Sequence, residues 1–258
     1  MTPSANPPPL LGPDDPEPVI CLNPRGRSPF ILTGDHAGCA IPARLGTLGL
    51  EEEDLSRHIA LDTGVAELGA AMSERLDAVF LAQAYSRLVI DCNRAPSSAE
   101  AILAIADATP VPGNAGLTGL ARELRVNEIH APYHARLAEE IQARWHPGTP
   151  VVLIALHSFT PVLGEVVRPW DVGILHAGGN ESFSRRLLDA FAREPGLRVG
   201  DNQPYHMDET DYSIPRHAFG STLDYAEIEV RQDHIADGAG QRHWSELLCM
   251  ALEEAHSR

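Results

Sequence analysis

The stretch Phe30-Ile31-Leu32-Thr33-Gly34-Asp35-His36 carries the strongest signal for the fold. Its first four residues form an apolar run typical of a buried strand, and Gly34 ends that run. An acid and an imidazole follow at once, at the carboxyl end of the predicted strand. Open α/β sheets bind their ligands outside this end of their strands. The stretch therefore predicts an α/β protein, and an enzyme, with reactive groups at one sheet edge.

Apolar runs and helical patterns alternate along the rest of the chain. Such alternation predicts a mostly parallel central sheet between layers of helices. Pro132 is expected at the first turn of one helix, which leaves His130 outside it. The predicted helices span residues 66–83, 133–145, 181–193 and 241–256, and the predicted strands span residues 30–33, 86–91, 151–156, 171–175 and part of 223–231.

The chain of 258 residues is long enough to bury a full core. Residues 1–18 are rich in proline and lack the basic start and apolar centre of a secretory signal, so we expect a poorly ordered segment there. Residues 19–258 are expected to form a single catalytic domain.

Acidic residues outnumber basic ones, with 36 against 20, and the net charge is −16. This balance argues against binding to nucleic acid, whose affinity depends on basic contacts to phosphate, and disfavours an anionic membrane surface. No apolar run approaches the roughly 20 residues of a membrane helix. The four cysteines are scattered, which indicates reduced thiols in a cytoplasmic protein.

His36 and His157 each come directly after an apolar run, so both should lie at the same sheet edge. Two imidazoles and a carboxylate are a common ligand set for catalytic zinc. Two histidines at equivalent positions favour a metal over the alternative that each bonds only a neighbouring backbone group. Asp62, in Leu61-Asp62-Thr63-Gly64, is either the carboxylate ligand or the N-terminal cap of the next helix.

Glu229 lies in the strand pattern Glu227-Ile228-Glu229-Val230-Arg231. A carboxylate near a metal can take a proton from water and pass it to a leaving amine. The alternative is that both acids face solvent and that one of them pairs with Arg231.

Asn93 and Arg94 follow the strand predicted at residues 86–91. The rigid donor fork of arginine matches a carboxylate, so this pair is a candidate clamp for a substrate carboxylate. The competing interpretation is a salt bridge from Arg94 to Asp91 or Asp62.

His134 and Tyr205 lie in short aromatic and polar turns, and we expect both to line the substrate site. Ser158 follows His157, but no Gly-x-Ser-x-Gly elbow surrounds it, so a serine nucleophile is disfavoured.

Five segments occur in an order that resembles the N-formylglutamate amidohydrolase family. They are Asp-His-Ala-Gly-x-x-Ile-Pro (35–42), Tyr-Ser-Arg-Leu-Val-Ile-Asp-Cys-Asn-Arg (85–94), Pro-Tyr-His (132–134), Leu-His-Ser-Phe (156–159) and Glu-Val-Arg-Gln-Asp (229–233). The resemblance runs from about residue 30 to the C-terminal helix. It implies a three-layer α/β/α fold with a mixed sheet, similar to that of zinc carboxypeptidases and aspartoacylases.

The resemblance also implies roles for individual residues. His36 and His157 would be metal ligands, and Glu229 would be the general base, with Arg231 as its catalytic neighbour. The peptidase pattern has a ligand glutamate three residues after its first histidine, but this chain has Cys39 there, so Asp62 takes the place of the third ligand.

By the same resemblance, Asn93 and Arg94 would hold a substrate carboxylate. The implied protein is a hydrolase that uses zinc or another divalent metal to cleave the amide of an N-formyl or N-acyl acidic amino acid, such as N-formylglutamate. The resemblance further implies a role in histidine catabolism. A zinc peptidase or deacylase with other substrates and a non-catalytic binding protein on the same fold are the alternatives. The oligomeric state is not predicted.

Overall fold

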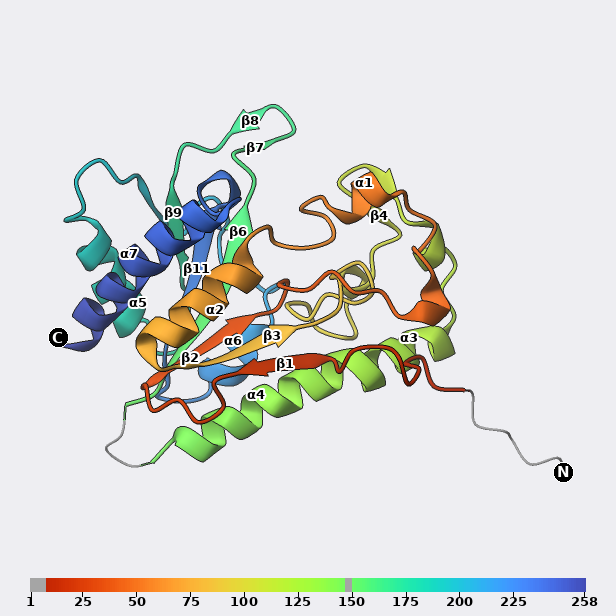
Figure 1. Ribbon diagram of the computed structural model, residues 1–258, viewed down its shortest axis with the longest axis horizontal. Coiled ribbons are helices and arrows are strands. Elements are labelled where there is room, and N and C mark those ends of the chain that lie inside the picture. The colour runs from red at the N-terminus through yellow and green to blue at the C-terminus, as the bar shows by residue number, and fades with distance from the viewer. Residues whose placement is uncertain (1–7, 147–149) are drawn as a thin grey trace, which may run out of the picture.

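The computed structural model of the chain describes residues 8–146 and 150–258 (Figure 1). A central seven-stranded sheet has the strand order β1-β3-β2-β6-β11-β9-β10. The strands of this sheet are β1 (Val19–Leu22), β2 (Phe30–Gly34), β3 (Val79–Gln83), β6 (Val152–Phe159), β9 (Val172–Leu175), β10 (Val199–Asp201) and β11 (Asp224–Arg231). Two small hairpins lie outside it: β4 (Ile105–Ala106) with β5 (Thr109–Pro110), and β7 (Val162–Leu163) with β8 (Val166–Val167).

The four central strands β3, β2, β6 and β11 run parallel to one another. β1 is antiparallel to β3, and β9 is antiparallel to β11. The predicted α/β fold with a mixed, mostly parallel sheet is therefore confirmed. Because β2 and β6 are parallel neighbours, the residues at their carboxyl ends lie at one edge of the sheet.

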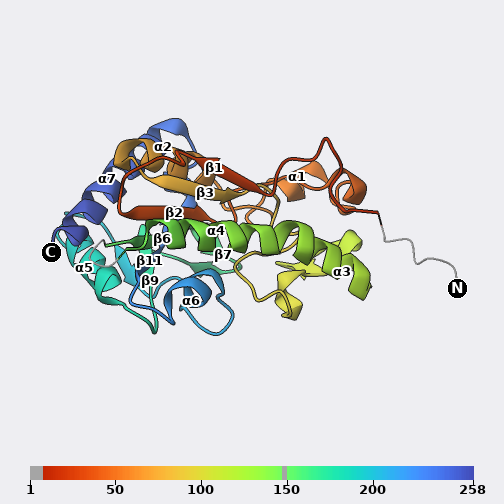
Figure 2. The same cartoon turned by 90° about the horizontal axis from the view of Figure 1, so that it is seen from below.

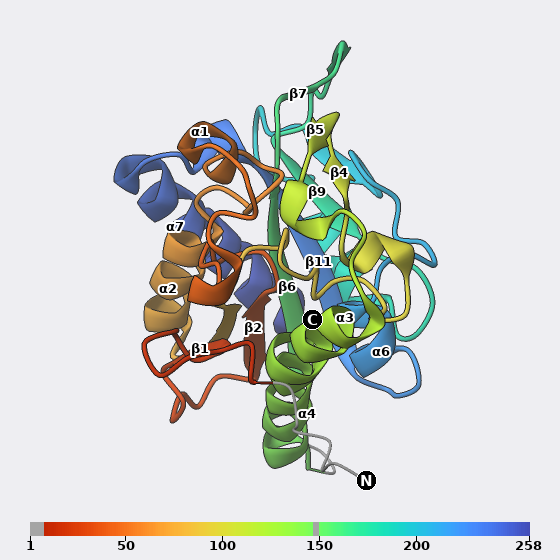
Figure 3. The same cartoon turned by 90° about the vertical axis from the view of Figure 1, so that its right-hand side faces the viewer.

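Helices cover both faces of the sheet (Figures 2 and 3). On one face, α2 (Val65–Leu76), α5 (Ser182–Phe191) and α7 (Gly238–His256) share an apolar core with the sheet. On the other face, α4 (Ala131–Arg144) and α6 (Ser213–Ala218) contribute to a second core. Two further short helices are α1 (Glu52–Leu55) and α3 (Gly119–Arg125). None of the described helices combines the length and the apolar composition that a membrane span needs.

The helix predicted at residues 66–83 is too long, and the strand predicted at residues 86–91 is wrong. The helix ends at Leu76 because Asp77 adopts a left-handed conformation, with φ of 51°, and its N–H bonds Ser73. The fully buried residues Val79–Gln83 form β3 in the interior of the sheet. Residues 86–91 belong to the loop that follows β3.

The helix predicted after Pro132 begins earlier than expected. α3 continues through a π-helical turn, Val126–His130, directly into α4. His130 is therefore helical rather than outside the helix, and its ring centroid lies 4.5 Å from that of His134.

Residues 10 and 11, within the segment predicted to be poorly ordered, contact the helical turn before α4. The backbone N–H groups of Leu10 and Leu11 each donate to the carboxylate of Glu128 at 2.8 Å, and the Leu10 side chain is buried. Contacts with the rest of the chain thus begin before residue 19, and residues 1–7 of the expected poorly ordered segment lie outside the described residues.

The loops that follow β2 and β3 carry an apolar cluster of their own. Leu48, Ile59, Tyr85, Ile90 and Ile129 are among its buried members. This cluster lies beyond the carboxyl ends of the central strands, and it fixes the loops from which several polar side chains reach the sheet edge.

Candidate metal and substrate site

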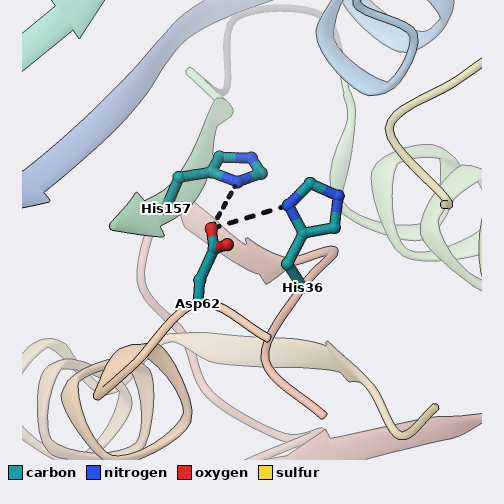
Figure 4. A group of neighbouring side chains, drawn as sticks. All are labelled: His36, Asp62 and His157. Carbon is teal, nitrogen blue, oxygen red and sulfur yellow. Dashed lines mark hydrogen bonds and ion pairs between the residues drawn. The ribbon is translucent and has the colours of Figure 1, made fainter. Parts of the chain in front are cut away.

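Three of the predicted site residues converge at the carboxyl edge of the sheet (Figure 4). His36 follows β2, His157 lies on the neighbouring strand β6, and Asp62 comes just before α2. Asp62 Oδ2 lies 3.0 Å from His157 Nδ1 and 3.5 Å from His36 Nδ1. One ligand atom from each residue falls within 4.8 Å of the others, so the three could hold one metal ion.

The chemistry of this cluster fits a divalent metal. All three side chains are buried, with exposed fractions of 3 to 5%. His36 Nδ1 and His157 Nε2 have no hydrogen-bond partner among the residues that the structure describes. Two imidazoles and one carboxylate match the ligand preference of zinc and leave room in the coordination sphere for a reacting group.

The Asp62 side chain is not a helix cap. Its Oδ2 accepts a hydrogen bond from the Ser158 N–H at 3.2 Å, and the first residues of α2 receive no side-chain cap. Burial raises the pKa of Asp62, but the imidazoles of His36 and His157 outweigh burial and hold the pKa well below its usual value. Asp62 is therefore an anionic group facing two histidines.

Asp91 and Arg87 orient His36 through hydrogen bonds on the Nε2 side of its ring. The Nε2–H of His36 donates to Asp91 Oδ1 at 2.7 Å, and Arg87 donates to Asp91 Oδ2 from two nitrogens, at 2.6 and 3.1 Å. Burial and Arg87 lower the pKa of His36, but the carboxylates of Asp91 and Asp62 raise it by more. The bond at Nε2 directs Nδ1 of the ring towards Asp62, which is how outer residues commonly orient a metal ligand.

The sequence does not by itself predict this support: Asp91 is a candidate salt-bridge partner for Arg94 only, and Arg87 lies in a predicted strand. The available signal was the spacing of Arg87 and Asp91, four residues apart in a segment that also contains Asn93 and Arg94.

Glu229 lies beside the three-residue cluster. β11 pairs with β6 in a register that places Glu229 opposite His157. Burial raises the pKa of Glu229 to about 7, and Oε2 of its carboxyl group has no hydrogen-bond partner in the described ranges. Glu229, His36, Asp62 and His157 all line one cavity of about 440 Å³.

Asn93 and Arg94 also line this cavity. Asn93 Oδ1 accepts hydrogen bonds from the N–H groups of Tyr212 and Ser213 at 3.0 and 2.9 Å. Arg94 donates to the carbonyl of Thr210 at 3.3 Å rather than forming the salt bridge to Asp91 or Asp62 that was the competing interpretation. The pair therefore ties the loop after β3 to the segment before α6.

The remaining predicted site residues have different positions. Tyr205 lines the cavity, and its hydroxyl accepts a hydrogen bond from Arg168 at 2.9 Å. His134 is not among the lining residues; its Nε2–H donates to the carbonyl of Cys92 at 2.8 Å, so it lies behind the loop that carries Asn93.

Arg231 also fails to reach the cavity, contrary to the expectation of a catalytic role. It is the last residue of β11, and its guanidinium turns to Asp233 at 2.7 Å and Asp171 at 3.3 Å. These ion pairs hold the end of β11 in place. They account for the position of Arg231 without a catalytic role.

The fold and this buried polar centre define an α/β protein with a candidate metal site at the carboxyl edge of its sheet. Residues 28–236 match the model of the family described as N-formylglutamate amidohydrolase. The chain therefore belongs to the N-formylglutamate amidohydrolase family and is a hydrolase acting on amide bonds.

Solved structures resemble the chain over nearly its whole length. The gene product Atu2144 from Agrobacterium tumefaciens shares 32% identity at a TM-score of 0.92, with 96% of this chain and 98% of that chain covered. The N-formylglutamate amidohydrolase from Ralstonia eutropha JMP134 shares 21% identity at a TM-score of 0.74, with 93% of this chain and 98% of that chain covered, and shows the same fold. No curated protein matches the sequence.

Proposed function

We propose that the chain is a metal-dependent amidohydrolase that removes a formyl or other small acyl group from the nitrogen of an amino acid. The observation that carries this proposal is the convergence of His36, Asp62 and His157 in the cavity that also contains Glu229. The family membership supports amide hydrolysis, and the geometry supports the choice of these four residues.

His36, Asp62 and His157 would hold the metal, with zinc as the ion that best matches the donor set. A divalent metal in this position polarises a carbonyl and lowers the pKa of water. The chain supplies the orientation: Asp91 fixes the ring of His36, and the Ser158 N–H helps to fix Asp62. Such outer contacts keep the ligand atoms in place before the metal arrives.

Glu229 is proposed as the group that moves protons. Its pKa of about 7 suits a carboxyl group that accepts a proton from water and returns it to the leaving nitrogen. Glu229 lines the cavity, and its Oε2 has no hydrogen-bond partner among the described residues. Asn93 and Arg94 are proposed to bind the α-carboxylate of the substrate and so to align the amide with Glu229.

The size of the cavity favours an amino-acid derivative over a peptide. Its volume of about 440 Å³ is near the lower end of the range for ligand pockets, roughly 300–1,000 Å³. A substrate with one amino acid and one small acyl group fits this space, whereas a peptidase needs a cleft that extends beyond the metal.

Metal analysis and hydrolysis assays test the proposal together. We expect the purified protein to bind about one zinc ion per chain and to lose hydrolysis of N-formyl amino acids when a chelator removes it. The substitution Glu229→Gln should lower kcat by about 100-fold or more while the metal content stays unchanged. Glu181→Gln provides a matched control, because Glu181 pairs with Arg185 away from the cavity. Full activity of metal-free protein would disprove the mechanism.

A further inference from the structure

Arg168 is a buried arginine that forms no ion pair with an acid of the described residues. Only 6% of it is exposed, and its guanidinium donates one hydrogen bond in residues 8–146 and 150–258, from Nη1 to the hydroxyl of Tyr205 at 2.9 Å. Arg125, which is also buried, donates to three oxygen atoms of the protein. A buried charge is costly unless it is paired, so Arg168 indicates an anion that a ligand supplies.

The chain holds Arg168 beyond the carboxyl end of β6, on the side of the sheet where the proposed metal ligands lie. β6 carries His157 and ends at Phe159, and the hairpin of β7 and β8 follows directly and projects past the end of this strand (Figure 1). The N–H of Arg168 donates to the carbonyl of Pro161 at 2.9 Å, which closes the base of the hairpin. Arg168 is therefore fixed at the same sheet edge as His157.

Tyr205 connects Arg168 to the cavity. Tyr205 is a lining residue, and Cζ of Arg168 lies 4.7 Å from the centroid of its ring, so the guanidinium covers the ring and also bonds the hydroxyl. Because the hydroxyl oxygen accepts a hydrogen bond from Arg168, its own O–H is free to donate, and no described residue receives it. Partial burial and the charge of Glu229 raise the pKa of Tyr205, so the hydroxyl keeps this proton. A hydroxyl that is polarised by a cation is a strong donor to an anion.

The two arginines that line the cavity already have acidic partners in the protein. Arg87 donates to Asp91 at 2.6 Å, and Arg94 lies 3.5 Å from Asp211. Arg94 with its neighbour Asn93 is proposed above to bind one carboxylate of the substrate. A substrate that carries a second carboxylate needs a further positive group, and the pair formed by Tyr205 and Arg168 supplies one whose charge the described residues leave unbalanced.

We propose that the Tyr205 hydroxyl, held by Arg168, binds the side-chain carboxylate of the substrate. This inference rests on the proposed function and adds a residue pair that determines its specificity: Asn93 and Arg94 bind the α-carboxylate, and the pair of Tyr205 and Arg168 selects an acidic side chain. The hydroxyl donates its proton to the carboxylate in a hydrogen bond, and the guanidinium behind it balances the charge. Arg168 acts through Tyr205 and is therefore a positioning residue.

Two substrates of the same shape, Nα-formyl-L-glutamate and Nα-formyl-L-glutamine, test the inference on the zinc-loaded, full-length protein. We expect kcat/KM to favour the glutamate compound by at least about tenfold, because only its side chain is an anion. Tyr205→Phe removes the hydroxyl alone and should reduce this preference by about tenfold, through a higher KM for the glutamate compound. Arg168→Gln should have the same effect. Calorimetric binding of both compounds to the Glu229→Gln variant gives a readout that does not depend on turnover, and it should show the same preference.

Arg216→Gln is the matched control. Arg216 donates to the hydroxyl of Tyr212 at 2.9 Å and lies 5.4 Å from the centroid of its ring, but Tyr212 does not line the cavity, so the preference should stay unchanged. Tyr205 is 40% exposed, so Tyr205→Phe keeps the test valid if Arg168→Gln fails to fold. Hydrolysis without a preference for the glutamate compound, or an equal loss of kcat on both compounds in Tyr205→Phe, would overturn the inference and leave the proposed function intact. Preferential binding of the glutamate compound without hydrolysis of either would overturn the proposed function alone.

Discussion

At the scale of single residues, the proposed metal site depends on Asp91, a residue outside the lining of the cavity. Asp91 bonds the outer nitrogen of His36 and receives Arg87 on its other oxygen. Without this carboxylate, the imidazole loses the contact that directs Nδ1 towards Asp62. Asp91 is thus a positioning residue, and its substitution should change metal affinity more directly than it changes the rate of hydrolysis.

We therefore expect Asp91→Asn to weaken zinc binding by about 10- to 100-fold, because an outer carboxylate that orients a ligand histidine commonly has an effect of this size. Competition with a chromogenic chelator measures the change directly. Asp233→Asn is the matched control, since Asp233 also pairs with an arginine, Arg231, whereas Asp91 in addition bonds the proposed ligand His36. Equal zinc affinity in both variants would contradict the role of Asp91.

At the scale of secondary-structure elements, the loop after β2 must pass very close to the end of β3. The N–H of Ala40 donates to the carbonyl of Ala84 at 3.1 Å, and Gly38 lies against the same backbone. A Cβ atom on Gly38 would come within 2.1 Å of Ala84 O and 2.4 Å of Gln83 O. Only glycine allows this approach, which places His36 beside Asp91 from the loop after β3.

Gly38→Ala should accordingly lower the free energy of unfolding by about 1–3 kcal/mol, because the backbone must move to admit the methyl group. Urea unfolding of the metal-free protein measures this loss. The control is Gly119→Ala in α3, where nothing lies within 4 Å of an added Cβ, and its effect should stay within about 0.5 kcal/mol. A Gly38→Ala variant as stable as the control would show that the loop can yield without cost.

The elements that the sequence predicted correctly are those with a single clear pattern. β2 and β6 are predicted from short, bounded apolar runs, which brings His36 and His157 to one edge, and β11 is predicted from the alternating pattern that contains Glu229. β3 was missed because residues 79–83 continue the helical pattern of α2, and only the left-handed turn at Asp77 separates them. Local periodicity does not distinguish a buried strand from the last turn of a helix.

The unpredicted parts of the site come from contacts between distant loops. The pairing of His36 with Asp91 and that of Asn93 with the backbone of Ser213 join segments 55 and 120 residues apart. The direction of a strand in the sheet is another feature that depends on distant segments. His176 also follows an apolar strand, but β9 runs antiparallel to β11, so His176 lies at the opposite edge from His157. Side-chain type and spacing do not determine such long-range pairings.

At the scale of the whole molecule, buried histidines make stability depend on pH. His134 and His217 lie in contact on the far side of the Asn93 loop, with 3.0 Å between His134 Nδ1 and His217 Nε2. Burial lowers the pKa of His134 from 6.5 to about 3 and that of His217 from 6.5 to about 4. Both imidazoles are therefore neutral in the folded protein at a pH where the unfolded chain has already bound protons.

The sign of the pH dependence follows from this difference. Between about pH 6.5 and 4, the unfolded state holds more protons on these two residues, so the free energy of unfolding falls as the pH falls. His217→Gln retains a donor for His134 and removes one titrating group, which should reduce the slope by up to about 1.4 kcal/mol per pH unit. Urea unfolding of metal-free protein across this range measures the slope, with His243→Gln on the exposed side of α7 as the control. A slope in His217→Gln equal to that of the control would mean that His217 binds its proton at the same pH in the folded protein as in the unfolded chain, which contradicts a buried, neutral imidazole at this position.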